Sequence, residues 1–433
     1  MSRNKGAKTK RLNGTLGRKN TAPNKVGALI MNGFAVTGKL VLGTTYKLES
    51  SSDILNVLGV DAAYDTTNKV LVYHHLSRFF KRNPGSTLYV FFVPQKVSTD
   101  HITLDTICDV ANPTYLTKFL TDVKASLQTG GSSVILSLGV CANPHTTYTK
   151  TVVTGMDTPV LAAIPKLQAN LAVFEDDYFF VNAWLEGRGF TGVITDLLSL
   201  RSLTGVLAAR VSVVIAADPI ISGLGAANTQ AADYAAIGDV VGLDTLAALS
   251  QNVGEAVQAF NLQDAASNSF MSAGVSGNFL VSSFTSDQLN SLDTKGYIFC
   301  ETLAGYAGVY ISDSHTCVAI TDDYGYKENN YVIDKAQLLR RGALIPLTTN
   351  ARLQADTSTG ELSAAAKAGI QNAVNKAIED NMAADISGKV DSFIPAGINV
   401  LAGEAIDVQC SFVPLVIGRL VTINSGFKNP ALA

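Results

Sequence analysis

The stretch YISDSHTCVAITDDYGYKENN, residues 310–330, gathers side chains that could bind a metal or take part in catalysis. They are Asp313, His315, Cys317, Asp322 and Asp323. Alternate residues of a strand point to the same face, so His315 and Cys317 could act together on a metal. No second pair of His or Cys lies at zinc-finger spacing, and the chain has only five histidines, so we expect all five to be structural.

A nucleophilic Cys–His pair is the other chemistry that this stretch could support. Such a pair needs a third group that orients the histidine, and the sequence offers none that can be nominated. We therefore expect a crossing from a core strand into a helix that begins near Tyr331, with His315 and Cys317 facing inward. The two aspartates before Gly325 are typical of a turn.

Two glycine motifs resemble phosphate-binding loops. GFAVTGKL, residues 33–40, matches G-x-x-x-x-G-K, but Leu40 stands where Ser or Thr would hold magnesium, and more strand follows instead of a helix. GRGFTG, residues 187–192, does not lie in the first strand-to-helix turn of a clean unit. The first motif favours a β-hairpin around Thr37 and Gly38, and the second favours a glycine-rich turn. We therefore expect no catalytic, cofactor-binding or metal-binding residues.

The composition is that of a protein rich in packing and interfaces. Of 433 residues, 47% are hydrophobic and only 16% are charged, which excludes a disordered chain. No run of eighteen apolar residues is present, and the basic start has no apolar stretch after it, so we expect neither a membrane span nor a secretory signal. The five scattered cysteines predict reduced, mostly buried thiols and folding in the cytosol. They are Cys108, Cys141, Cys300, Cys317 and Cys410.

Charge is distributed unevenly along the chain. Residues 1–25 hold eight Lys or Arg and no acidic residue. Since the whole chain has 33 basic and 36 acidic residues, the remainder carries 25 against 36, a net charge of −11. A basic tail on an acidic body could bind nucleic acid, or it could lie along another copy of the same acidic protein.

Strand-like and helical segments alternate along most of the chain, which predicts α/β units with a mixed, largely parallel sheet flanked by helices. The expected strands are 26–32, 86–94, 132–140 and 210–218. The expected helices are 51–59, 68–85, 112–128, 158–173 and 231–252.

The last third of the chain changes character. Residues 295–312 predict a strand and a turn, and 331–346 a helix that Pro346 stops. A further helix over 361–384 has an apolar stripe, with a capping box formed by Ser358 and Glu361. Two strand-like runs, 405–416 and 417–427, end the chain.

Several of these segments, in order, resemble the sheath proteins of contractile phage tails and related contractile injection systems. The resemblance rests on LNGTLGRKN followed by VGALIMNG, on RVSVVIAADP with the helix after it, and on residues 295–336. It continues through LIPLTTNARLQADTSTGELS and VPLVIGRLVTINSGF. It is specific at the two ends and in 295–362, and looser in about 95–180 and 255–294.

The resemblance implies a mechanical role. Sheath subunits form stacked rings around an inner tube, lend terminal arms to neighbouring subunits as added strands, and contract to drive the tube through a cell envelope. No nucleotide or other cofactor is consumed. The implied partners are further copies of the chain, the inner tube protein, and baseplate and terminator or cap proteins, without nucleic acid or membrane insertion. Assembly is expected in the bacterial cytoplasm, as part of a virion tail or a released or anchored particle.

The resemblance also implies a division of the chain. Residues 1–25 form a basic arm, 26–94 and 295–404 an inner, tube-proximal core, 95–294 an outward-facing α/β insertion, and 405–433 the C-terminal strands. The expected contacts between subunits are Arg11, Leu12, Leu16, Arg18, Val408, Phe412, Val413, Leu420 and Ile423. The helix over 361–384 is the candidate tube-facing element, through Lys367, Lys376, Glu379 and Asp380, and the alternative is an ordinary amphipathic surface helix.

Two other classes remain open. An α/β enzyme with a phosphate-bearing cofactor would have to act despite two defective glycine motifs and no evident catalytic group. A nucleic-acid-binding protein would use the basic arm, and its binding to DNA would weaken steeply with salt.

Overall fold

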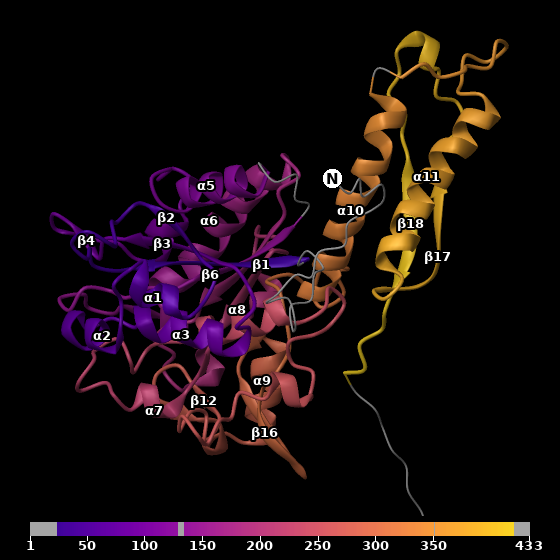
Figure 1. Ribbon diagram of the computed structural model, residues 1–433. Helices are drawn as coiled ribbons and strands as arrows, with labels where there is room; N and C mark the ends of the chain where they lie inside the picture. The colour runs from indigo at the N-terminus through magenta and orange to yellow at the C-terminus, as the bar shows by residue number, and fades with distance from the viewer. Residues whose placement is uncertain (1–23, 129–133, 350, 420–433) are drawn as a thin grey trace, which may run out of the picture.

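The computed structural model describes residues 24–128, 134–349 and 351–419. Residues 24–128 and 134–326 form an α/β body, and residues 327–349 and 351–419 form a C-terminal module that stands beside it (Figure 1). The module consists of α10 (Lys327–Thr348), α11 (Ala364–Met382), β17 (Ile386–Phe393) and β18 (Gln409–Pro414).

A seven-stranded sheet is the centre of the body. Its order is β14 (Tyr297–Ile298), β10 (Val211–Val214), β9 (Val181–Glu186), β6 (Ile135–Val140), β1 (Lys25–Asn32), β3 (Leu88–Val93) and β2 (Thr45–Leu48). Neighbours pair in parallel, except β2, which runs antiparallel to β3. The predicted class, a mixed and largely parallel sheet flanked by helices, is confirmed.

The central strands are rich in apolar residues, as expected where both faces of a sheet are covered. Every residue of β1, β3, β6 and β9 is buried. One face carries α3 (Val72–Arg82) and α8 (Ile237–Leu246), and the other carries α5 (Leu116–Gln128) and α6 (Thr158–Glu175) (Figure 1).

Shorter elements surround these layers. The remaining helices are α1 (Ser52–Asn56), α2 (Ala62–Asn68), α4 (Leu104–Cys108), α7 (Pro219–Ser222) and α9 (Ser286–Thr294). Small strands form pairs or a triplet: β4 (Lys96–Val97) with β5 (Asp100–His101), β7 (Val152–Val153) with β8 (Met156–Asp157), β11 (Ala216–Ala217) with β12 (Gly274–Val275) and β13 (Phe279–Leu280), and β15 (Cys300–Leu303) with β16 (Tyr306–Ile311).

A glycine lets α8 lie directly on α3. A Cβ atom at Gly238 would be 2.2 Å from the backbone oxygen of His75, so any side chain would push the helices apart. Next to it, Asp239 is fully buried and accepts hydrogen bonds from Arg78 (3.2 Å) and Arg82 (2.6 Å). Burial alone would raise the pKa of Asp239, but the two guanidinium groups lower it to about 2. The packing of α8 on α3 thus depends on the absence of a side chain at Gly238 and on the ion pairs of Asp239.

The C-terminal module has a core that continues into the body. Ile370, Val374, Ile378 and Met382 of α11 are buried, which confirms most of the predicted apolar stripe. Val374, Ile378 and Met382 share a cluster with Tyr331, Val332 and Ala336 of α10, and with Ile135 and Phe180 at the start of β6 and β9. The module is therefore packed against the amino ends of the central strands.

Two predicted helix boundaries were wrong. The helix expected over 331–346 begins at Lys327 and continues past Pro346 to Thr348. A proline removes one hydrogen bond and crowds the preceding turn, which an exposed last turn tolerates better than a helix interior. The cap of α11 is Ser363, whose hydroxyl accepts from the backbone N–H of Ala366, so the predicted box at 358–361 is not the start of this helix.

The strand predictions also needed correction near the C-terminus. β17 was not predicted, and it pairs antiparallel with β18, which confirms a strand within 405–416. Residues 417–419 carry no strand, and the rest of the predicted run 417–427 lies outside the described residues. At residues 33–40 the chain makes a tight turn, with Gly38 at a φ of 74°, but β1 and β2 do not pair, so no hairpin forms there.

The expected division at residue 94 does not separate two sheets. β1 and β3 come from 26–94, while β6, β9 and β10 come from 95–294, and all five lie in one sheet. Which parts of the chain face a tube and which face outward stays a prediction.

Candidate functional site

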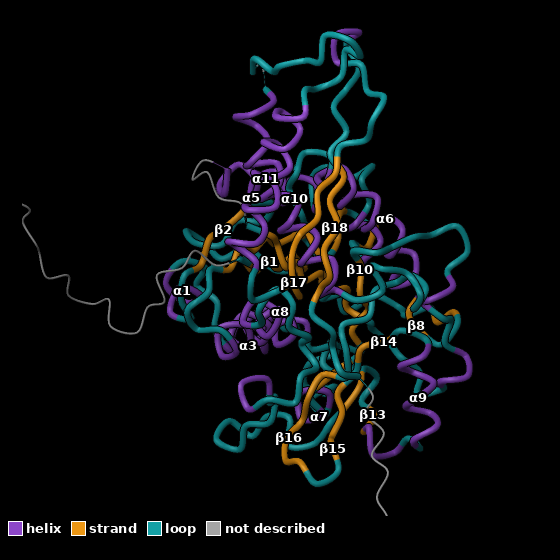
Figure 2. The backbone as a smooth tube through the Cα atoms, turned by 90° about the vertical axis from the view of Figure 1, so that its right-hand side faces the viewer, coloured by secondary structure: helices purple, strands orange, loops and turns teal. Residues whose placement is uncertain are grey.

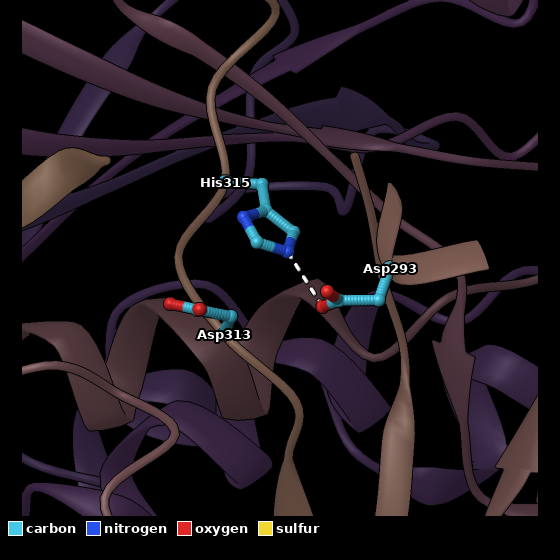
Figure 3. A group of neighbouring side chains, drawn as sticks. All are labelled: Asp293, Asp313 and His315. Atoms are coloured by element: carbon cyan, nitrogen blue, oxygen red, sulfur yellow. Dashed lines mark hydrogen bonds and ion pairs between the residues drawn. The ribbon is translucent and has the colours of Figure 1, made fainter. Parts of the chain in front are cut away.

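The one group of described side chains with metal-compatible geometry lies in the stretch that opened the sequence analysis (Figure 3). Asp313 and His315 follow β16, and Asp293 comes from α9. Their ligand atoms lie within 4.8 Å of one another, and His315 Nε2 is 2.7 Å from Asp293 Oδ1. Asp313 and His315 could be identified as candidates from the sequence, whereas Asp293 carries no local signal.

Two arginines donate hydrogen bonds to side-chain atoms that would otherwise be available to bind a metal cation. Arg201 Nη2 bonds to Nδ1 of His315, and Arg419 Nε lies 2.8 Å from Asp313 Oδ2. Because a guanidinium only donates, Nδ1 of His315 must accept, which places the ring proton on Nε2 where it is donated to Asp293. A metal on Nε2 would need the opposite tautomer. The donor set is therefore already satisfied as an ion-pair network, and it does not fit a metal.

Asp313 is stabilised as a carboxylate. Burial raises its pKa, but the hydrogen bond and positive charge of Arg419, together with the hydrogen bond from the backbone N–H of Ser314, outweigh that effect, so the pKa lies below its usual range. Asn252 and the backbone N–H of Ser314 donate to the same carboxylate. This network holds the chain in place after β16 and just before α10.

The residues between His315 and α10 form the predicted turn. Asp322 accepts from the backbone of Tyr324 (2.8 Å) and of Gly325 (3.0 Å). His315 pairs with Tyr326 and Cys317 with Ala208 in isolated bridges, and both side chains are 1% exposed. The inward placement of His315 and Cys317, and the turn at Asp322–Gly325, are confirmed.

The cysteines offer no activated thiol among the described residues. Cys108, Cys141, Cys300 and Cys317 are buried, and burial raises the pKa of each. For Cys317 the pKa rises to about 12, although Lys327 and Arg201 oppose the shift. A nucleophilic cysteine needs the reverse, a pKa lowered toward neutrality. These thiols fill space in the core.

The second glycine motif serves the body's interior. Arg188 within it is buried, and its guanidinium donates to the oxygen of Ala142 (2.8 Å), to Glu186 (3.3 Å) and to Gln230 (2.8 Å). Gly192 has a φ of 80° and packs against the ring of Phe279. The motif is a turn after β9, as predicted.

Exposed apolar side chains lie on and next to the C-terminal strands, at Phe393, Val413 and Val416. Figure 2 shows β17 and β18 side by side, and they form a separate two-stranded sheet. Side chains of α11 cover the outer edge of β17: Gln371 donates to the oxygen of Ser392, and Glu379 accepts from the N–H of Val390. Among the described residues β18 pairs with β17 alone, so its outer edge is unpaired. An unpaired edge is a template for a strand from another chain.

The predicted contact residues of this region point in two directions. Val408 and Phe412 are half-buried and pack on the module's own core. Val413 is 58% exposed, and Val416 just beyond β18 and Phe393 at the opposite end of β17 are also exposed. Arg11, Leu12, Leu16 and Arg18 in the N-terminal arm, and Leu420 and Ile423, lie outside the described residues.

The four polar residues predicted to face a tube also differ in placement. Lys376 and Asp380 are exposed and form an ion pair one turn apart on α11, with 3.3 Å between Nζ and Oδ2. Lys367 pairs with Glu361 at 2.6 Å, and Glu379 turns toward β17. Only Lys376 and Asp380 are thus left free to meet another molecule from this set.

No helix in the described part of the chain is long and apolar enough to cross a membrane. A comparison with curated proteins finds no match.

Solved structures of contractile assemblies share this fold. A chain of the contracted helical sheath of the anti-feeding prophage superposes with a TM-score of 0.56 at 11% identity, covering 99% of this chain and 100% of that one. A chain from the baseplate structure of the same prophage gives 0.55 at 12%, covering 97% and 100%. A chain of the contracted PVC sheath complex, an extracellular contractile injection system, gives 0.55 at 10%, covering 100% and 99%. Body and C-terminal module together therefore have the fold of contractile sheath subunits.

The match to a sequence family covers the body. Residues 5–315 match the family described as DUF2586, N-terminal domain, and the match ends at His315, twelve residues before α10 begins. Since 5–315 is well over half of the chain, the protein belongs to the DUF2586 family.

Proposed function

We propose that the protein is the structural subunit of a contractile tail sheath, which polymerises as stacked rings around an inner tube and contracts to drive that tube through a target envelope. The observation that carries the proposal is the end-to-end likeness in fold to a chain of a contracted sheath, over 99% of this chain and 100% of the other. It includes the C-terminal module as well as the sheet of the body. No nucleotide is consumed, because the energy is stored at assembly.

Strand exchange between copies links the subunits. The outer edge of β18 is unpaired among the described residues, and Val413 beside it is exposed. A strand added to this edge would gain a ladder of main-chain hydrogen bonds, whose register the side chains then specify. The basic arm of residues 1–25 supplies the opposite charge to a body of net charge −11. The partner of each arm is thus a second copy of the same chain.

The inner tube is a second partner. We assign its contact to α11, where Lys376 and Asp380 are exposed on the side away from the buried stripe. Baseplate and terminator proteins close the two ends of the polymer, and assembly takes place in the bacterial cytoplasm. The particle is a virion tail or a released or anchored injection device.

Electron microscopy of the purified protein tests the proposal. We expect rings or cylinders from the chain alone, or on addition of a matching inner tube. A protein that stays monomeric at high concentration and does not coat the tube would contradict the sheath role. Strong, salt-sensitive DNA binding that is lost with residues 1–25 would favour the nucleic-acid alternative instead.

Removal of residues 1–22 tests the arm separately. The truncated chain should keep its circular dichroism spectrum and lose the ability to form long cylinders. A matched control keeps the full length but changes the seven basic residues before Lys25 to Gln, which separates charge from length. Normal cylinders from the truncation would refute the role of the arm and leave the sheath fold untouched.

A further inference from the structure

Arg419 occupies a built pocket at the start of α10. Its Nε lies 2.8 Å from Asp313 Oδ2, its Nη2 bonds to Glu328, and its guanidinium carbon lies 3.5 Å from the centroid of the Tyr326 ring. A planar guanidinium both pairs with carboxylates through a fork of donors and stacks on aromatic rings, which a lysine ammonium does not reproduce. Asp313, Tyr326 and Glu328, called here the arginine pocket, use both properties at once.

The two carboxylates of the pocket are buried, and residues of the body donate hydrogen bonds to both. Asp313 is 7% and Glu328 3% exposed. Asn252 donates to both carboxylates, and the hydroxyl of Ser314 donates to Glu328. Two buried carboxylates this close repel each other unless a cation lies between them. The guanidinium supplies that cation.

The root of the N-terminal arm is held at the same end of α10. Lys25 begins β1, and its ammonium lies 3.0 Å from the buried Asp244 and 4.5 Å from the centroid of the Tyr331 ring. Trp184 Nε1 (2.8 Å) and the hydroxyl of Tyr331 donate to the same carboxylate. Tyr326 and Tyr331 are five residues apart, about 7.5 Å along a helix axis. Both ends of the described chain are therefore fixed within the first turns of one helix.

We propose that the arginine pocket is a binding site for the C-terminal arm, and that it joins the roots of both arms at the first turns of α10. The proposal rests on the proposed function, since it gives the arms their common attachment. Arg419 is the last described residue, so the pocket holds the described chain at its C-terminal end. A load on either arm then reaches the same rigid helix end.

Trypsin provides a direct readout, because it must take the arginine side chain into its own specificity pocket. Cleavage after Arg419 should track the fraction of molecules in which the guanidinium has left the arginine pocket. Arg352 is an exposed residue between α10 and α11, and the structure assigns it no ion pair. Trypsin cuts after it in the same digest, so its cleavage is the internal reference for the digestion rate. We expect cleavage after Arg419 to be at least about tenfold slower than after Arg352 in the native protein.

Changing the pocket while keeping the arginine makes the test specific. Glu328→Gln and Asp313→Asn should each speed cleavage after Arg419 about tenfold relative to Arg352. Arg419→Lys keeps a tryptic site and the positive charge. Cleavage at this position, relative to Arg352, should be faster than in the native protein, because the forked hydrogen bonds and the ring stacking of the guanidinium are lost. Asp380→Asn, an exposed change on α11, is the matched control and should leave the ratio unchanged. Circular dichroism checks that each variant is folded.

Equal cleavage at the two sites in the native protein, or pocket variants that leave the ratio unchanged, would overturn the proposal. If the pocket variants fail to fold, Arg419→Lys is the substitute, because it changes neither buried carboxylate of the pocket. An unchanged ratio in that variant then counts against the site. Since digestion is read on the unassembled subunit, a failure to form cylinders would contradict the sheath role without touching this result.

Discussion

The guanidinium of Arg210 donates two hydrogen bonds to the carboxylate of Asp334, 2.8 Å from Nη1 to Oδ2 and 2.9 Å from Nη2 to Oδ1. Arg210 precedes β10 and Asp334 lies on α10, so this pair ties the C-terminal module to the sheet. Arg210 also donates to Glu175 of α6 at 2.7 and 2.8 Å. Arg210 thus forms ion pairs with two carboxylates that differ in exposure. Asp334 is fully buried, while the Glu175 side chain is 38% exposed.

Loss of Arg210 should be the most damaging change in this group. Arg210→Met leaves Asp334 buried, with Asn182 as its remaining hydrogen-bond donor among the described residues, and we expect a loss of about 3 kcal/mol in the free energy of unfolding at pH 8. Asp334→Asn keeps an acceptor for the guanidinium and should cost about 1 kcal/mol. Chemical denaturation measures both. Glu175→Gln is the control and should change stability less than either.

The damage from Arg210→Met should depend on pH. Burial raises the pKa of Asp334, and Arg210 offsets part of that rise. Without Arg210 the folded-state pKa rises further above the unfolded value, so the folded state binds the proton and loses stability as pH increases. The variant should therefore be closer to the native protein at pH 5 than at pH 8. A difference that does not vary with pH would contradict this account of the pair.

Lys327 predicts a second pH effect, with the opposite direction. Its ammonium is fully buried, donates to the oxygen of Ala183 (2.7 Å) and lies 4.6 Å from the Trp184 ring centroid. Burial lowers its pKa to about 7, although Asp244 opposes the shift. Because the unfolded lysine titrates near 10.5, the unfolded state binds more protons between these values, and this contribution to stability rises with pH from about 7 upward.

Lys327→Met isolates that contribution. The difference in free energy of unfolding between the two proteins should change by a few kcal/mol between pH 7 and 10, about 1.4 kcal/mol for each pH unit in that range. Trp184 is the single tryptophan of the chain, so its emission should also titrate near pH 7 in the native protein and not in the variant. An emission that is constant from pH 5 to 9 would show that Lys327 does not change charge there.

The cysteines should differ in reactivity. Cys410 of β18 is half-buried, whereas Cys108, Cys141, Cys300 and Cys317 are buried with raised pKa values. Iodoacetamide at pH 8 should therefore modify Cys410 in the native protein and the other four only after unfolding. Mass spectrometry of the labelled peptides measures this, and Cys410→Ser should abolish native labelling. Cys317→Ser should still form cylinders, since no chemistry depends on that thiol.

An engineered disulfide tests whether β18 stays with its own subunit. Ser392 of β17 lies opposite Cys410 of β18 in an antiparallel pair, a spacing that a disulfide can bridge. Ser392→Cys should form this bond under oxidation and stabilise the subunit by about 3 kcal/mol. We expect the oxidised protein to assemble as well as the reduced one, because the neighbour's strand adds to the outer edge of β18.

The same experiment also detects the opposite result, in which the disulfide blocks assembly. Cylinders that form only after reduction would show that β18 must leave β17 on assembly, which would contradict the proposed edge addition. The double variant Ser392→Cys/Cys410→Ser cannot form the bond and controls for the substitution itself.

Local pattern determined much of the body. The runs that became β1, β3 and β6 are mostly apolar, and the apolar residues of the segment that became α3 have roughly helical spacing, so each could be predicted from its own residues. β17 could not, because only two of the first five residues of ISGKVDSF are buried, and its place depends on β18 and α11.

The structure of the stretch 310–330 could likewise be predicted only in part from its own residues. Its residues alone predicted the turn and the inward His315, since backbone preferences and a short sequence separation decide both. The partners that explain its charges come from distant parts of the chain: Asp293 from α9, Arg201 from the loop after β9, and Arg419 from beyond β18. Only the folded chain brings them together, because a buried charge selects its partner by distance in space and not by spacing in sequence.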